Sequence, residues 1–588
     1  MRKLNRIRIR IHKKHYRPFP KPEIFWLSSY SYHHRYIRIE DRGCIQGGLS
    51  RFVCSLIDFS FVRSLVADKY GITGVAYDPV SLFLLQLFCY LEKYPDMKTF
   101  LETLRDKERG KHYRIYSGIR YSDIPCEATF TNLKKRLSTE RYEQIFQVLV
   151  EIVDLLGFLS YKIFAIDGTL FPTNSRYKGC TYFSPQCRCI EFHGLIENVR
   201  KRILYRLRDP AKIVLGKEIR IKVECPSSKF PEDVTRPKVE LLVLTLEEAN
   251  HEQPNILNQL FALKEELAEA KLDLVAKRGL LHTINLADEV DSFAFCCPKL
   301  PSDMEARIGV RRDLKNPNRK EKIFGFNAVI ATSVELTLGI EVPVACITIA
   351  GNSQEGNQYI PLKEQVANGQ GKNSKIDLAD AKYDELHNYK FSRDHGSIPV
   401  IDYNPRNEKI SLPALKQRGY DQNGWPYAPC GTLTRPNGFD FASKRANFSC
   451  RRQCLETANP VLQKYADHCP HWINYQGFST HMSTKQFPRL ITEVIRGTRR
   501  HKQVKSLRPA SERINSTAKD GLNILTRPKI RGLNNAGILA LLAVMAVMLK
   551  RIAAFIVKVT LSVRKKRHDS EVQPQRIYLP GPRVPKFI

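Results

Sequence analysis

The order of strand-length apolar segments in the middle of the chain most constrains the fold. Such runs of mostly Ile, Val, Phe and Ala predict buried strands. They occupy 161–166, 322–332, 342–350, 375–379 and 397–403. Short helical patterns lie on either side of the fourth segment, at 362–366 and 383–389. Strands interleaved with helices in this way predict an α+β fold with a mixed sheet flanked by helices.

Two of these segments lead directly into aspartates. Asp167 follows the first segment and is itself followed by Gly168, so we expect a turn there, and Asp380 follows the fourth. A carboxylate at the end of a buried strand is where α/β sheets place their chemistry, although an Asp in a turn is the plainer alternative.

A third acidic candidate lies in the stretch K-S-L-R-P-A-S-E-R-I-N-S-T-A-K, 505–519. Pro509 suits the first turn of a helix, and seven residues make almost two turns, so Glu512 and Lys519 should share a face. Arg508 precedes the proline, which favours an extended backbone at Arg508. A solvated helix face with ordinary surface charges is the alternative.

The charge balance points to a polyanionic partner. Among 588 residues, 94 are Lys or Arg and 60 are Asp or Glu, a formal net charge of +34. Such an excess is typical of nucleic-acid-binding proteins, although ribosomal and membrane-surface proteins share it. The basic segment 496–502 contains Arg499, Arg500 and Lys502, which we expect to contact DNA phosphates rather than form only a solvated face.

The cysteines and apolar segments bear on location. The basic first residues lack a continuous apolar stretch, so we expect no secretory signal, a cytoplasmic protein and mostly reduced thiols. The apolar run 536–549 is interrupted by Lys550 and Arg551, so we expect a buried helix rather than a membrane span. A zinc site is an alternative to reduced thiols for one group of residues, Cys450, Cys454, Cys469 and His471.

The region before the first strand reads as helical. Asp78 and Pro79 form a typical helix start, and further helices are expected at 128–137 and 140–156. Short helices carrying Arg and Lys are compatible with DNA binding, as they are with any small helical domain. A charged amphipathic helix is expected at 257–275.

Taken in order, these motifs resemble bacterial insertion-sequence transposases of the DDE class, whose catalytic core is ribonuclease H-like. Arg508, Glu512 and Lys519 match three of the four positions in the signature Y-x2-R-x3-E-x6-K, and Lys505 stands where the Tyr is expected. The family's first motif resembles Asp167-Gly168-Thr169, and its second, D-x-x-Y-D, resembles 380–384.

The resemblance implies that Asp167, Asp380 and Glu512 ligate two Mg²⁺ or Mn²⁺ ions. Asp377 is the second choice for the second of these positions, and we expect Asp384 to be structural or to lie outside the direct metal ligands. The resemblance also implies that Arg508 and Lys519 hold DNA phosphates, and that a homodimer, nucleoid-associated in a bacterial cytoplasm, binds terminal inverted repeats, cleaves the strands and joins them to target DNA. Two alternatives stay open: a DNA-binding protein of transposon origin that no longer cuts, and a structure-specific nuclease on the same fold.

The chain divides accordingly. We expect a basic arm at 1–30, a helical DNA-binding domain at 31–157, and the first part of the core at 158–403 with a helical insertion at about 190–300. An insertion domain at 404–495, the last part of the core at 496–560 with the Glu-bearing helix, and a basic tail at 561–588 complete it.

Overall fold

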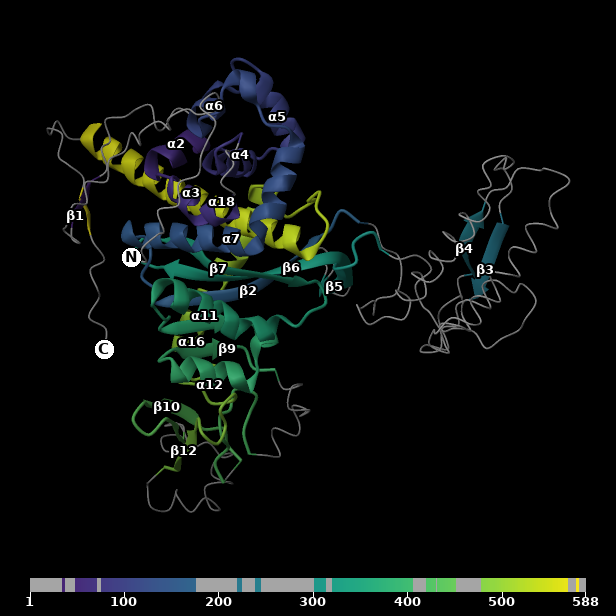
Figure 1. The fold of residues 1–588 in the computed structure, drawn as a ribbon. Helices are drawn as coiled ribbons and strands as arrows, with labels where there is room; N and C mark the ends of the chain where they lie inside the picture. The colour runs from purple at the N-terminus through teal and green to yellow at the C-terminus, as the bar shows by residue number, and fades with distance from the viewer. Residues whose placement is uncertain are drawn as a thin grey trace.

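The computed structural model describes residues 48–70, 76–175, 301–312, 320–404, 419–429, 431–450 and 477–568, together with four isolated strands. Those strands form two antiparallel pairs, β1 (His34–Tyr36) with β13 (Tyr578–Pro580) and β3 (Ile219–Glu224) with β4 (Lys238–Leu244). In Figure 1 the N-terminal helices lie on one side of a central sheet and a small lobe lies on the other.

The N-terminal region is helical, as predicted. Asp78 accepts a hydrogen bond from the Val80 amide at 3.0 Å, and Pro79 is the first helical residue. The longest helix of this region breaks at Ser138, where φ is 54° and ψ 174°, so the two helices predicted on either side are confirmed. The elements are α2 (Leu49–Leu56), α3 (Phe61–Val66), η2 (Ala67–Lys69), α4 (Pro79–Leu91), α5 (Met97–Arg105), α6 (Lys111–Ser117), η3 (Tyr121–Asp123) and α7 (Glu127–Leu155).

In the described part of the chain, six strands form one mixed sheet, which confirms the predicted α+β class. They are β2 (Ile163–Pro172), β5 (Arg307–Arg312), β6 (Lys320–Glu335), β7 (Ile340–Ala350), β8 (Ile376–Ala379) and β9 (Ile398–Ile401). Across the sheet the order is β7, β6, β2, β8, β9, and β5 pairs with the first part of β6. β2, β6 and β7 are antiparallel, whereas β8 and β9 run parallel to β2.

Helices cover both faces of the sheet. On one face, Ile163 and Ala165 of β2 pack with Ala510 of α17 (Pro509–Ser516). α16 (Arg499–Lys505) lies on the same side, and η7 (Thr517–Gly521) continues α17. On the other face, Phe164 and Ile166 pack with three further elements, α11 (Tyr359–Gln370), η5 (Ala381–Tyr383) and α12 (Leu386–Asp394); η4 (Glu355–Gln358) leads into α11. Alternate residues of β2 thus serve two separate cores.

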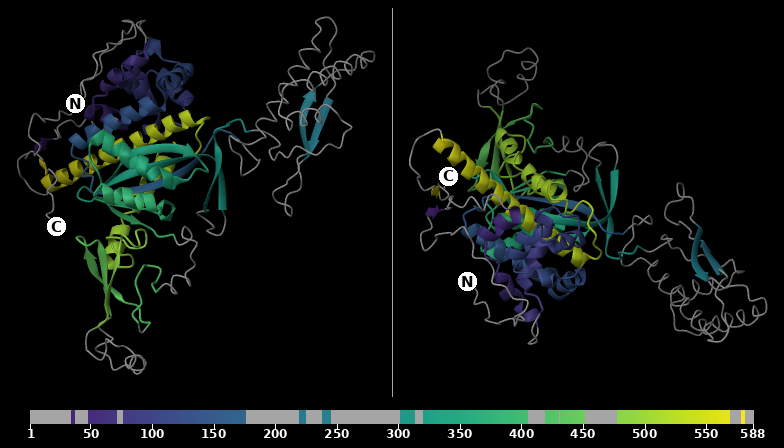
Figure 2. Two further views of the ribbon diagram at one scale, coloured as in Figure 1. Left: turned by 60° about the horizontal axis from the view of Figure 1, so that its bottom comes forward. Right: turned by 90° about the horizontal axis from the view of Figure 1, so that it is seen from above.

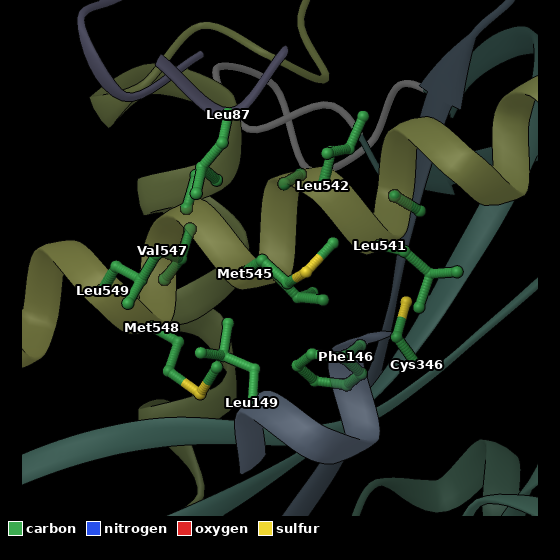
Figure 3. Close-up of a cluster of buried hydrophobic side chains, with 14 of the residues drawn as sticks. Leu87, Phe146, Leu149, Cys346, Leu541, Leu542, Met545, Val547, Met548 and Leu549 are labelled. Atoms are coloured by element: carbon green, nitrogen blue, oxygen red, sulfur yellow. The ribbon is translucent and has the colours of Figure 1, made fainter. Parts of the chain in front are cut away.

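The longest helix, α18 (Leu533–His568), forms the centre of the main core. It lies between the N-terminal helices and the sheet in every view, with neighbours on α4, α7 and β7 (Figures 1 and 2). In Figure 3, Met545 of this helix faces Phe146 and Leu149, and Leu541 lies beside Cys346. Dense packing of this kind fixes the N-terminal region on the sheet.

The apolar length of α18 exceeds our expectation. Lys550 and Arg551 do not end the helix, and Leu533–Val559 is the one stretch within the described residues that is long and apolar enough to cross a membrane. Of its most apolar window, 72% is buried inside the protein, as a core helix requires. The two cations reach η7 instead of breaking the helix, with Lys550 Nζ 3.3 Å from the Gly521 carbonyl and an Arg551 nitrogen 3.1 Å from Thr517 Oγ1.

The small lobe has a core of its own. β10 (Arg435–Asp440), β11 (Arg445–Ser449) and β12 (Ser479–Ser483) form an antiparallel sheet. Tyr420, Phe448, Met482 and Leu490 form its hydrophobic cluster. The expected boundary of an insertion domain at 404–495 stays a prediction, and the described residues within the other insertion are strands β3 and β4. The basic arm 1–30 and the expected helix 257–275 lie outside the described residues.

Candidate functional site

The register of two parallel strands brings the first two predicted carboxylates together. The ladder between β2 and β8 ends at the pair Ile166 and Ala379, and the next residue on each strand is Asp167 or Asp380. Neighbouring strands lie about 4.8 Å apart, so the two backbones are adjacent at this point. Asp380 then caps η5 by accepting a hydrogen bond from the Lys382 amide at 2.9 Å.

One detail of the first motif was wrong. Gly168 does not form a turn, because β2 continues to Pro172 with β6 as its antiparallel partner. Asp167 therefore lies inside a strand, at the point where one of its two neighbouring strands ends. Its backbone stays paired with β6, while the ladder with β8 has ended one residue earlier.

The pKa values of both aspartates are raised. Burial raises the pKa of Asp167 to about 7, and the negative charge of Asp380 adds to this, while Arg508 opposes it. Burial likewise raises the pKa of Asp380. Two crowded carboxylates that resist ionisation gain from a nearby cation, and perturbed groups of this kind cluster at functional sites.

Helix α17, which carries the third predicted carboxylate, Glu512, lies beside the two aspartates. Asn515 Nδ2 donates to Asp167 Oδ2 at 3.1 Å, which ties the helix to the strand. The Arg508 guanidinium lies 2.6 Å from Glu512 Oε1 and 4.0 Å from Asp380 Oδ2. Asn515 thus contacts Asp167, and Arg508 lies between Asp380 and Glu512, whose side chain is 54% exposed and directed at Arg508.

The backbone of Arg508 differs from the prediction. Its φ of −56° and ψ of −37° are helical, not extended. The preference that proline imposes on the residue before it is overcome by a hydrogen-bonded turn between α16 and α17, in which the Arg508 amide donates to the Lys505 carbonyl at 3.0 Å. Pro509 is the first residue of α17, as expected.

Lys519 and Lys505, at the other signature positions, have separate environments. Beyond Ser516 the helix widens to a π-helical turn that contains Lys519, a feature often found at functional sites. Burial and then Arg311 lower the pKa of Lys519 to about 8, against the opposing charges of Asp520, Glu321 and Asp167. Lys505, which replaces the expected Tyr, pairs with Asp402 at 2.6 Å.

The basic segment before α17 divides into exposed and buried parts. Arg499, Arg500 and Lys502 are exposed on α16, as a phosphate-contacting strip requires. Arg496 was wrongly grouped with them, because it is buried and donates to Tyr389 Oη and the Ile401 carbonyl, both at 2.8 Å. The exposed strip therefore consists of three side chains.

The two other acidic candidates belong to structural networks. Asp377 is fully buried and pairs with Lys363 at 2.5 Å. Asp384 is also fully buried, bonded to Arg489 at 2.5 Å and to the Tyr389 hydroxyl at 2.8 Å. Asp377 is thus directed away from the site, and Asp384 has the structural position that we expected.

Sequence reasoning missed a fourth carboxylate, Glu355 of η4. Its Oε1 accepts from Asn327 Nδ2 at 2.8 Å and from Lys382 Nζ at 2.9 Å. A Cβ placed on Gly168 would lie only 2.6–2.9 Å from the three carboxyl atoms of Glu355. The glycine of the first motif therefore allows the close approach of an acidic side chain. The only sequence signal was an acidic residue shortly after the third predicted strand.

Several polar atoms around these residues are buried without a hydrogen-bond partner. They are Glu355 Oε2, Tyr383 Oη, Asn515 Oδ1 and Arg508 Nε. Buried polar atoms are normally paired, and carboxylate and amide oxygens are the ligands that Mg²⁺ and Mn²⁺ prefer. Within the described ranges, no group of three or more Asp, Glu, His or Cys side chains lies close enough together to hold a metal ion. The donor set fits a divalent cation once the cationic side chains give way.

The zinc alternative cannot be assembled from the described residues. Cys450 is half-buried and forms no disulfide. Cys454, Cys469 and His471 lie outside the described residues.

Comparison of the chain with protein-family models, with curated proteins and with solved structures found no match. The function is therefore inferred from the site itself.

Proposed function

We propose that the protein is a DDE transposase that binds terminal inverted repeats and performs divalent-cation-dependent DNA strand cleavage and strand transfer. The observation that carries this proposal is that Asp167 and Asp380 follow paired residues at the end of the β2–β8 ladder, and that α17 reaches them through Asn515 and through Arg508, which also holds Glu512. Carboxylates remote in sequence that converge beside exposed cations suit phosphoryl transfer on a polyanion.

A ribonuclease H-like core is part of the same proposal. Three antiparallel strands followed by two parallel ones, with the first strand in the middle, support it. The candidate site lies at the end of the β2 and β8 ladder, where chain segments from several elements converge. The helix bearing Glu512 packs on the sheet face that carries Ala165.

The protein's own residues have distinct roles in this scheme. A divalent cation held by Asp167, Asp380 and Glu512 would polarise the scissile phosphate and favour ionisation of a water or 3′-hydroxyl. Asn515 holds the Asp167 carboxylate in position through its 3.1 Å hydrogen bond. Arg508 holds Glu512 and faces Asp380, so an incoming phosphate has a guanidinium that it can engage.

DNA binding would extend beyond the reaction centre. Arg499, Arg500 and Lys502 lie on α16, immediately before the turn that carries Arg508, so a DNA backbone at the site could continue along them. Contacts of this type supply salt-dependent affinity without reading sequence. Because transposition needs two ends held together, we propose a homodimer on DNA.

The direct test uses a supercoiled plasmid that carries the coding region with its natural flanking DNA. Incubated with Mg²⁺ or Mn²⁺, the full-length protein should cut at fixed positions beside the coding region and join the freed 3′ ends to a second DNA. Asp167→Asn, Asp380→Asn and Glu512→Gln should each reduce cleavage by at least about a thousandfold while DNA binding persists.

Glu364→Gln provides a matched control, since Glu364 is an exposed glutamate on α11. It should cut like the unaltered protein. Cleavage without joining would favour the structure-specific nuclease. DNA binding with no cleavage by the unaltered protein would favour the silent DNA-binding protein.

A further inference from the structure

Glu355 and Lys382 form an ion pair at the edge of the carboxylate site. Lys382 Nζ lies 2.9 Å from Glu355 Oε1, and the Lys382 side chain is 58% exposed while that of Glu355 is 8% exposed. Lys382 is two residues after Asp380, and the Lys382 backbone amide donates a hydrogen bond to the Asp380 carboxylate. A buried carboxylate is thus neutralised by a cation that can leave for solvent.

The position of Glu355 places it beside the first aspartate. Its carboxyl group fills the space where a side chain at Gly168 would begin, directly after Asp167. The absent Cβ lets an acidic group from η4 reach the strand backbone, which any larger residue would prevent. Its charge also acts on the ionisation of both Asp167 and Asp380, so the three carboxylates share one electrostatic environment.

One oxygen of Glu355 has no partner. Oε2 is buried and makes no hydrogen bond, and the hydroxyl of the fully buried Tyr383, whose ionisation responds to the charges of Glu355 and Asp167, is also unpaired. An unpaired buried carboxylate oxygen is costly. A partner that binds this oxygen would remove the cost. Divalent cations are typical partners of carboxylate oxygens in proteins.

We infer that Glu355 is an additional carboxylate of the divalent-cation site and that Lys382 is its counter-ion while the cation is absent. The inference rests on the proposed function, and it adds a residue outside the resemblance to DDE transposases. When the cation binds Glu355, the Lys382 ammonium group is released to solvent, where it can meet a DNA phosphate. No covalent bond is made or broken when the divalent cation replaces the Lys382 ammonium group beside Glu355.

The test is calorimetric titration of the full-length protein with Mn²⁺ in the absence of DNA. Glu355→Gln should weaken Mn²⁺ binding by about 10- to 100-fold. Lys382→Met should tighten it by about twofold to fivefold, because an exposed competing charge is worth little more than that. Glu385→Gln is the matched control, since Glu385 contacts Gln354 and His387 instead and should leave binding unchanged.

The outcomes separate this inference from the proposed function. Wild-type Mn²⁺ affinity in Glu355→Gln, alongside lost binding in Asp167→Asn, would overturn the inference and leave the transposase proposal standing. Wild-type affinity in Asp167→Asn would remove the metal centre and both proposals with it. If Glu355→Gln fails to melt cooperatively in EDTA, Lys382→Met decides: tighter binding supports the inference, and equal or weaker binding contradicts it.

Discussion

Asp377 lies on β8, and Asp380 directly follows that strand. The two aspartates nevertheless have opposite surroundings. Asp377 is fully buried, and its oxygens are bonded to Lys363, Ser374 and Ser392. Asp380 is 22% exposed, accepts one backbone hydrogen bond, and faces Arg508 at 4.0 Å. The first carboxylate has all its partners inside the protein, whereas the second keeps room for another.

The difference separates structural charge from available charge. A buried pair such as Lys363 and Asp377 contributes little net stability, but removing one member leaves the other charge unpaired. A carboxylate with few hydrogen-bond partners, such as Asp380, lowers the stability of the folded protein until a ligand binds it. A cation-binding site therefore needs carboxylates like Asp380, which have room for a further partner. The alternative assignment of Asp377 to the site loses its basis.

The largest effect should come from breaking the satisfied pair. We expect Asp377→Ala to lower the free energy of unfolding by about 3–5 kcal/mol, since Lys363 would remain buried without a counter-ion. Denaturant unfolding measures it. The double variant Lys363→Met, Asp377→Leu should recover most of the loss, and a loss below about 1 kcal/mol in Asp377→Ala would break the comparison.

The next effect should be a gain in stability. The folded-state pKa of Asp167 is about 7, above its ordinary value of 3.8. Between these values the folded protein binds the proton more tightly than the unfolded chain, so stability present below about pH 4 is lost as pH rises through 7.

Asp167→Asn removes this loss. Because Asp167 is partly exposed and screened by solvent, we expect a gain of about 1–2 kcal/mol at pH 8 and none at pH 4. Thermal unfolding in EDTA at both pH values measures it. Equal gains at the two pH values would point to packing instead of charge.

The cations sharpen the same contrast. Lys363 is buried and serves one carboxylate, whereas Arg499, Arg500 and Lys502 are exposed. Replacing each exposed cation with Gln should reduce the slope of log affinity for duplex DNA against log salt by about 0.9, with little change in stability. Lys375→Gln, at the opposite end of β8 from Asp380, is the control, and an equal slope change there would argue for unspecific attraction.

The smallest effect should follow at Asp380 itself. Asp380→Asn keeps an oxygen for the Lys382 amide and relieves repulsion with Asp167, so we expect the free energy of unfolding to change by less than about 0.5 kcal/mol. Chemical denaturation in EDTA provides the measurement. A loss comparable to that of Asp377→Ala would show that the two aspartates are equivalent structural residues.

Local patterns alone determined much of this protein. The strand and helix order, the cap at Asp78, the proline that opens α17 and the break between the two halves of α7 all follow from periodicity and from residues with restricted backbones. Such signals act within a few residues, so the chain carries them without knowledge of its fold. The position of Asp380 directly after a strand was correctly predicted for the same reason, whereas Asp167 lies inside β2.

Tertiary structure decided the rest. The strand continues through Gly168 because β6 extends past β8, Arg508 is helical because α16 and α17 share a turn, and Arg496 is buried under the Ile401 carbonyl. Glu355, from η4, reaches strand β2 next to Asp167 only because the residue there is a glycine. Each outcome depends on partners remote along the chain, whose distances and desolvation no local pattern encodes.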